Sequence, residues 1–98
     1  MFIEGLLKEE VDMKTGEFFI PDEIYLLCML HNIGATSPER ALTIEEIANW
    51  TALEQLRIER DLKILVDKNY VALNVDQLGR ERYFITADGI RKVMSMYS

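Results

Sequence analysis

Two helix-start signatures only eight residues apart constrain the fold of this chain more than any other feature. They are Thr43-Ile44-Glu45-Glu46 and Thr51-Ala52-Leu53-Glu54, and each has the pattern of a capping box. In a capping box, a threonine hydroxyl accepts from a free backbone N–H at the helix start, and the glutamate three residues later reaches back to the threonine N–H. Two helix starts this close together leave room for one short helix and a tight turn.

The residues after this pair predict a long amphipathic helix, a β-hairpin and a last helix. Residues 71–75 and 82–86 alternate between apolar and polar side chains, and the polar turn Asp76-Gln77-Leu78-Gly79 lies between them. Short helix, turn, long helix, hairpin and helix is the order of elements in a winged helix-turn-helix. The expected class is α+β, mainly α, with a three-helix core, a β-hairpin wing, a C-terminal helix and an N-terminal extension.

Length and composition agree with one small domain. Ninety-eight residues with 49% hydrophobic content can form a single core, which buries roughly 60–65% of the surface that the unfolded chain exposes. We therefore expect one domain over residues 1–98: an extension at 1–20, the helix-turn-helix at 43–69, the wing at 71–86 and the last helix at 87–97. The longest apolar run, 24–30, is far shorter than the ~20 residues that span a bilayer, and the first residues carry no basic segment, which favours the cytoplasm.

The first third of the chain holds one clear helix and one ambiguous segment. Residues 1–15 have helical spacing, yet residues 7–20 could equally form a hairpin around Gly16. From Pro21, acidic residues favour a helix N-terminus, and Asn32 with Gly34 predicts its end. This helix is apolar nearly all round, so we expect it to be the central one. Cys28 and His31 lie three residues apart on it, but zinc needs four ligands, and a buried thiol is the simpler interpretation.

Net charge argues against strong non-specific DNA binding. The chain carries −6, but residues 1–52 hold ten acidic and three basic side chains, whereas residues 53–83 hold six of each. The excess of acid therefore precedes the predicted helix-turn-helix. Because non-specific affinity for DNA depends on neutralising phosphates, such a surface predicts weak sequence-independent binding and leaves specific binding possible. The charges could also serve solubility alone.

The spacing of several residues from 43 to 89 resembles that of the winged helix-turn-helix in MarR-, ArsR- and PadR-type transcription regulators. The matching elements are Thr43-x-x-x-Ile47-Ala48, Ile58, Leu62-x-x-Leu65-x-x-x-Asn69-Tyr70-Val71 and Ile85-Thr86-Ala87-Asp88-Gly89. The resemblance implies a DNA-binding regulator. Ala52 and Asn69 stand where those families usually have glycine. Asn tolerates the left-handed conformation well, whereas Ala52 leaves the start of the long helix open between residues 52 and 55.

A helical wheel of the long helix suggests which residues contact DNA. Five residues gather on its inner side, namely Ile58, Leu62, Leu65, Val66 and Asn69. Arg57, Arg60 and Ile64 gather on the outer side, flanked by Lys63 and Asp61. Arginine can make bidentate contacts with guanine, and Gln55 could read adenine if the helix begins there. Alternatively, Arg57 pairs with Glu54 or Asp61, and both arginines are ordinary exposed charges.

Arg80 and Arg82 flank the tip of the predicted wing. A hairpin that carries arginines beside a recognition helix can contact phosphates or the minor groove, whose potential is strongly negative. Asp76 lies close by and weakens this prediction. A solvated wing without a partner is the alternative.

No motif for catalysis, metal or cofactor binding is evident, so we expect neither an enzyme nor a cofactor. Two binding functions compete. In the first, a homodimer formed through the N-terminal segment and the last helix reads double-stranded DNA as a transcription regulator, using Gln55, Arg57, Arg60, Lys63, Arg80 and Arg82. In the second, the same fold is a protein-interaction module, which the acidic balance and the apolar Leu56 and Ile64 favour.

Overall fold

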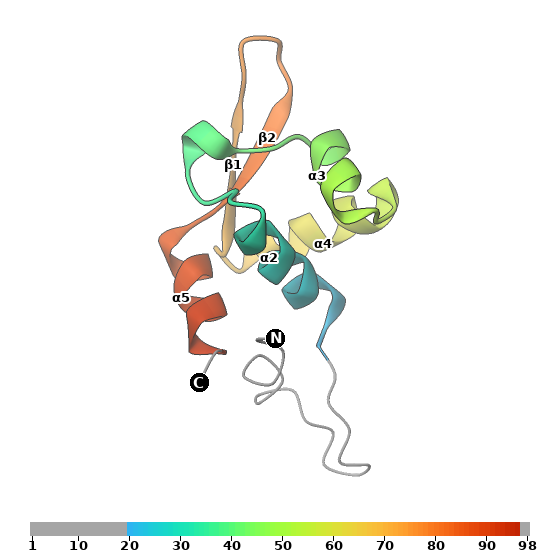
Figure 1. Ribbon diagram of the computed structural model, residues 1–98. Helices are drawn as coiled ribbons and strands as arrows, with labels where there is room; N and C mark the ends of the chain where they lie inside the picture. Colours follow the sequence, from blue (N-terminus) through green and yellow to red (C-terminus); the bar gives the residue numbers. More distant parts are fainter. Residues whose placement is uncertain (1–19, 97–98) are drawn as a thin grey trace.

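A computed structural model describes residues 20–96 of the chain and shows a winged helix (Figure 1). The order of elements is α2 (Asp22–Asn32), a 3₁₀ turn η2 (Pro38–Arg40), α3 (Ile44–Thr51), α4 (Gln55–Asp67), β1 (Val71–Val75), β2 (Glu81–Ile85) and α5 (Ala87–Ser95). In Figure 1 the hairpin β1–β2 projects away from the helices, and α3 and α4 lie on one side of α2 with α5 on the other. The interpretations of residues 1–19 lie outside the described residues.

Helix α2 is the central helix, as the sequence predicts. Pro21 is its N-cap residue, with Asp22 and Glu23 in the first turn, where acidic side chains complement the positive end of the helix dipole. Gly34 follows the end of the helix with φ +85°, a conformation that L-residues rarely adopt. The buried residues of α2 are Ile24, Leu26, Leu27, Cys28 and Leu30. The helix packs against α4, α5 and β2, so burying these side chains ties the helical core to the wing.

The first capping box is confirmed and the second is wrong. Thr43 Oγ1 accepts from Glu46 N at 3.1 Å, and Glu46 Oε1 accepts from Thr43 N at 3.0 Å. Thr51 instead ends α3, where its hydroxyl donates to Ile47 O at 2.8 Å and accepts from Leu53 N at 3.2 Å. The Thr51 hydroxyl therefore caps no residue of α4, which begins at Gln55.

Ala52 makes the turn between α3 and α4 in the left-handed conformation, with φ +62°. This geometry explains why related folds prefer glycine at the position, because a Cβ in this conformation costs roughly 1–2 kcal/mol. Asn69, the second departure from glycine, has φ +65° just before the wing. It holds this conformation and donates a side-chain hydrogen bond to Asp88 Oδ2 at 2.9 Å.

The wing is a two-stranded antiparallel hairpin joined to the core at its base. Val71 pairs with Ile85 and Val75 with Glu81. At the base Val71 and Ile85 are buried, whereas Val75 near the tip is exposed, so the alternation predicted from the sequence produces a buried face only in the lower half. Leu42 adds an isolated bridge to Tyr83, and this bridge attaches the segment before α3 to the second strand.

The start of α5 fits closely against the turn that joins α4 to β1. Thr86 caps α5 by accepting from Gly89 N at 3.0 Å, and its hydroxyl donates to Asn69 O at 2.7 Å. A Cβ added at Gly89 would lie 2.1 Å from Tyr70 O, so only glycine allows this approach. The predicted sequence Thr86-Ala87-Asp88-Gly89 therefore does open the last helix, which ends at Ser95 rather than at residue 97.

Candidate nucleic-acid interface

The helix that would enter a DNA groove is α4, the second helix of the helix-turn-helix. Ile58, Leu62 and Leu65 are buried as the wheel predicts, but Asp61 is buried with them. Val66 is only half-buried and Asn69 is exposed. The buried side of α4 therefore differs from the predicted one, because it includes Asp61 and leaves out Asn69. The reason is that α4 packs against both α2 and α3, which together shift the covered stripe toward Asp61.

Arg57 and Arg60 lie on the side of α4 that faces the start of α2. Arg57 pairs with Asp22 at 3.5 Å and with Asp61 at 3.6 Å, and Arg60 pairs with the same two carboxylates at 3.6 and 3.7 Å. The side chain of Arg57 is only 29% exposed, so its prediction on the outer side of the helix is corrected. Arg60 is 64% exposed and remains accessible. We refer to Asp22, Arg57, Arg60 and Asp61 as the charge cluster.

Asp61 is the member of the charge cluster that bears the largest desolvation cost. Its side chain is 2% exposed. Burial raises the pKa of its carboxyl above the ordinary value, and the positive charges of Arg60 and Arg57 offset only part of this increase. The two arginines therefore compensate for a buried negative charge, and this role competes with any contact to phosphate.

The solvent-facing side of α4 is centred on other residues. Gln55 is exposed in the first turn of α4, where it could reach a base edge, and Lys63 is exposed two turns later. Leu56 is 79% exposed next to Gln55, and Trp50 of α3 is 66% exposed. Glu59 is also exposed, midway between Gln55 and Lys63, so the outward side combines an amide, a carboxylate and an ammonium group with two large apolar side chains.

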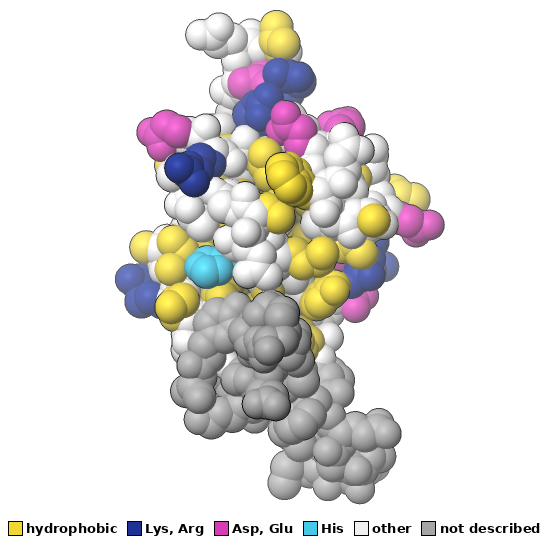
Figure 2. Space-filling view, in the orientation of Figure 1, with side chains coloured by type: hydrophobic (Ala, Val, Ile, Leu, Met, Phe, Trp, Pro, Cys, Tyr) yellow, Lys and Arg dark blue, Asp and Glu magenta, His cyan; other side chains and the backbone are white. Residues whose placement is uncertain are grey.

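Asp76 accepts hydrogen bonds from both arginines of the wing. Its Oδ2 accepts from Arg80 Nε at 2.9 Å and from Arg82 Nε at 2.8 Å. Arg82 Nη1 also donates to Glu46 Oε1 at 3.0 Å and to Ala41 O at 3.1 Å. These hydrogen bonds keep the pKa of Asp76 far below its usual range, mainly through Arg82. Figure 2 shows the resulting alternation of acidic and basic side chains on the wing.

Arg80 and Arg82 therefore differ in what they can offer to a partner. The side chain of Arg80 is half-exposed near the tip, whereas Arg82 lies lower on the strand and links the wing to α3 through Glu46. Of the two, Arg80 is the arginine that can reach a phosphate without breaking an interaction between elements.

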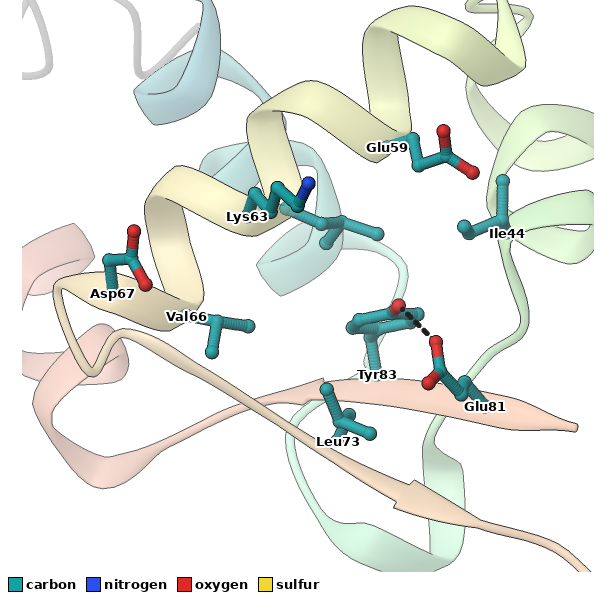
Figure 3. Close-up of a pocket in the computed structure, with 9 residues that line it drawn as sticks. Ile44, Glu59, Lys63, Val66, Asp67, Leu73, Glu81 and Tyr83 are labelled. Carbon is teal, nitrogen blue, oxygen red and sulfur yellow. Dashed lines mark hydrogen bonds between the residues drawn. The ribbon is translucent and has the colours of Figure 1, made fainter.

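A groove separates α4 from the wing (Figure 3). It has a volume of about 320 Å³. Its apolar lining consists of Ile44, Leu62, Val66, Leu73 and Tyr83, and its charged lining consists of Glu59, Lys63, Asp67 and Glu81. In Figure 3 the residues of α4 line one side, and Leu73 and Tyr83 of the two strands line the other. The groove thus joins an apolar floor to a rim that is mostly acidic.

Tyr83 lines the groove together with two of its carboxylates, and its pKa is affected by both. Its hydroxyl donates to Glu81 Oε1 at 2.9 Å. Burial, this hydrogen bond and the negative charges of Glu81 and Glu59 raise the pKa of Tyr83 to about 12. Burial is the largest cause and would act in any apolar site, whereas the smaller contributions of Glu81 and Glu59 reflect the negative charges around the groove.

The sequence indicated one partner of Arg57 and missed the other. The alternative pairing with Asp61 is confirmed at 3.6 Å, whereas the pairing with Asp22 was not expected. Asp22 lies 35 residues from Arg57 in the chain, so no local pattern joins them. The Asp76–Arg80 pair, by contrast, has four-residue spacing across a turn, and that spacing was a usable signal. Trp50 was also missed, although an aromatic residue just before the turn of a helix-turn-helix could have drawn attention.

Several solved structures with the same fold are DNA-binding proteins or transcriptional regulators by name. A DNA-binding TubR fragment from Clostridium botulinum has a TM-score of 0.67 and 22% identity over 81% of this chain and 99% of that chain. A MepR mutant from Staphylococcus aureus bound to an oligodeoxyribonucleotide has a TM-score of 0.65 and 20% identity over 80% of this chain. A MarR-family transcriptional regulator from Silicibacter pomeroyi has a TM-score of 0.67 and 20% identity over 98% of it.

At these identities the similarity establishes the winged-helix fold of MarR-type regulators. The chain spans 55% of that MepR chain and 59% of the Silicibacter regulator, but nearly all of the TubR fragment. No family model and no curated protein sequence matches the chain. None of the described helices is long and apolar enough to cross a membrane.

Proposed function

We propose that this chain binds double-stranded DNA through α3, α4 and the wing, and that it does so as a homodimeric transcription regulator in the cytoplasm. The observation that carries the proposal is the complete winged helix-turn-helix, in which α4 follows α3 through a tight turn and exposes its first turn to solvent. An α-helix presented in this way fits the major groove. The similar structures support it, since one of them is bound to an oligodeoxyribonucleotide.

Within this proposal the six candidate residues have different roles. Gln55 reads a base edge, and Lys63, Arg60 and Arg80 approach phosphates or bases. Arg57 and Arg82 each form ion pairs with carboxylates of the domain. Each must therefore break these ion pairs before it can contact DNA. Few free cations on an acidic protein predict weak non-specific affinity and a greater dependence on base contacts.

The experiment is selection of duplex sites from a random library, followed by fluorescence anisotropy on the selected duplex and a scrambled one. We expect a preferred site, and we expect Gln55→Ala to reduce the preference at one base pair because removing a bidentate hydrogen-bonded pair costs about 1–3 kcal/mol. The control variant is Gln77→Ala in the wing turn. Failure to enrich any site would contradict sequence-specific binding.

The homodimer is a separate part of the proposal. Helix α5 exposes Met94 and presents its outer face away from α4, and two copies joined there could place two α4 helices in successive major grooves, roughly 34 Å apart. Sedimentation equilibrium of the full chain tests it. We expect a dimer, and Met94→Glu should shift the population to monomer. A wild-type monomer at all concentrations would contradict it.

A second candidate function is protein binding, and one observation favours it. Among the described residues, five of the seven exposed large hydrophobics lie on the helix-turn-helix and the wing, namely Trp50, Leu56, Leu73, Val75 and Leu78. Exposed apolar side chains on these elements are suited to contact with another protein. This candidate predicts no DNA binding at low salt, together with partner capture that Leu56→Glu abolishes.

A further inference from the structure

The groove between α4 and the wing carries charges that the domain does not neutralise. Among residues 20–96, the side chains of Glu59 and Asp67 form no ion pair or hydrogen bond, and the side chain of Glu81 accepts only from the hydroxyl of Tyr83. Lys63 is the single cation in the lining. Three carboxylates against one ammonium leave an excess of two negative charges around an apolar floor.

Three other carboxylates of the described domain are paired with arginines. Asp22 and Asp61 face Arg57 and Arg60, and Asp76 holds Arg80 and Arg82. These four arginines therefore all pair with carboxylates that do not line the groove, although Arg80 lines a shallow neighbouring pocket together with Glu81. Since carboxylates that share a cavity repel one another, a cation in the groove would relieve an unfavourable interaction as well as form a new one.

We propose that this groove binds a small organic cation with an apolar body, such as an aryl-alkyl amine. Its apolar part would lie on Leu62, Val66 and Leu73, and its ammonium group would face the carboxylates of Glu59 and Glu81. The ring of Tyr83 adds an aromatic surface, which favours cations as well as apolar groups. Nothing in this proposal requires DNA, so it stands apart from the proposed function.

The dimensions of the groove select a small molecule. A volume of about 320 Å³ lies at the lower end of small-molecule sites, which are typically about 300–1,000 Å³. The lining is apolar at the floor and charged at the rim, as in sites where a few polar groups orient an apolar ligand. An anion is disfavoured by the excess of carboxylates, and a bare inorganic cation would leave the apolar floor unused.

The test is a titration of the isotope-labelled full chain, followed by amide shifts in NMR spectra near 0.15 M salt. Three probes of similar shape are compared: 2-phenylethylammonium, neutral 2-phenylethanol and the 3-phenylpropionate anion. We expect saturable shifts centred on Val66, Leu73 and Tyr83, with the cation bound at least about tenfold more tightly than the anion. No saturable shift, or equal binding of cation and anion, would overturn the proposal.

Matched variants separate a site from general charge attraction. Glu59→Gln/Glu81→Gln should weaken binding of the cation about five- to tenfold, since an exposed ion pair contributes up to about fivefold in affinity. The control is Glu39→Gln/Glu54→Gln, which makes the same change in net charge at exposed positions outside the groove. An equal loss with the control variant would overturn the proposal, as would shifts centred on another surface.

Discussion

Both sides of α4 carry charged residues, but the carboxylates are paired with arginines on one side and have no such partner among residues 20–96 on the other. On the side toward α2, Arg57 and Arg60 share the carboxylates of Asp22 and Asp61, and the four charges compensate one another. On the side toward the wing, Glu59 and Asp67 have no cationic partner among the described residues, and Lys63 does not pair with either of them. One side therefore stabilises the packing of two helices, while the other is left for a ligand.

The difference between the two sides arises from burial. An unpaired carboxylate in the position of Asp61 would be severely penalised, so its arginines are required there. Glu59 and Asp67 are exposed, and water screens them at little cost to folding. On α4, the buried carboxylate is therefore paired, and the exposed carboxylates that face the wing remain available to a ligand.

The largest expected effect belongs to the buried face that both sides of α4 share. Leu62→Ala should lower the free energy of unfolding by about 2–5 kcal/mol, because it removes buried methyl groups and leaves a cavity. Thermal and urea denaturation measure this change. The control is Leu56→Ala, which is exposed on the same helix and should change stability by less than about 0.5 kcal/mol. Equal effects would show that the placement of α4 is wrong.

The next effect tests the charge cluster. Arg57→Ala should cost about 1–3 kcal/mol, because it leaves the buried carboxylate of Asp61 with one partner fewer. Arg60→Ala should cost less, since Arg60 is mostly exposed. Urea denaturation at pH 7 compares the two variants. If Arg60→Ala costs as much as Arg57→Ala, the two arginines are equivalent and the distinction between them fails.

The pH dependence of stability sharpens the comparison because two carboxylates act with opposite sign. The pKa of Asp61 is raised by burial, so its ionised form is disfavoured in the folded state, and this penalty grows as pH rises through the interval between the unfolded and folded values. The melting temperature of Asp61→Asn, taken relative to that of the wild type, should therefore be higher at pH 7 than at pH 3.

The pKa of Asp76 is lowered by Arg82 and Arg80, so its contribution is present above the unfolded pKa, near 4, and disappears as pH falls through the folded value. Asp76→Asn should accordingly lower the melting temperature at pH 7 and lower it less at pH 3. Melting temperatures across this pH interval test both variants. The same sign for both would contradict the assignment of causes.

The smallest expected effect is on DNA affinity from the wing side of α4. Glu59→Lys should strengthen non-specific binding a fewfold and steepen its dependence on salt, because it replaces a repulsive charge by one that can neutralise a phosphate. Anisotropy with a random duplex measures both. Glu39→Lys, on η2 away from α4, provides the matched control, and an equal gain with it would mean that only net charge matters.

Most of the fold follows from local sequence signals. The Thr43 capping box, the glycine after α2, the hairpin turn and the start of α5 all appear where their residues predict them, because each depends on interactions within a few residues. The pattern Thr51-x-x-Glu54 failed for a physical reason. The Thr51 hydroxyl bonds back to Ile47, and Ala52 then ends α3 in the left-handed conformation.

The candidate site was less predictable. Gln55 and Lys63 lie on the exposed side of α4, and this follows from helical periodicity. The ion pair of Arg57 with Asp61 follows from their four-residue spacing, but the pair with Asp22 of a different helix does not. The burial of Asp61 was not predicted either, because the wheel places this residue at the flank of the outer side. Periodicity gives the direction of a side chain, whereas its partner is set by tertiary packing.

The most direct test of the central claim is the salt dependence of binding to a random duplex by the wild type and by Lys63→Ala/Arg80→Ala. If the winged helix binds DNA through these groups, affinity falls as salt rises, and the double variant lowers the slope by about 0.9 for each phosphate that it no longer neutralises. A wild type that shows no binding at low salt, or a variant with an unchanged slope, would contradict DNA binding through α4 and the wing.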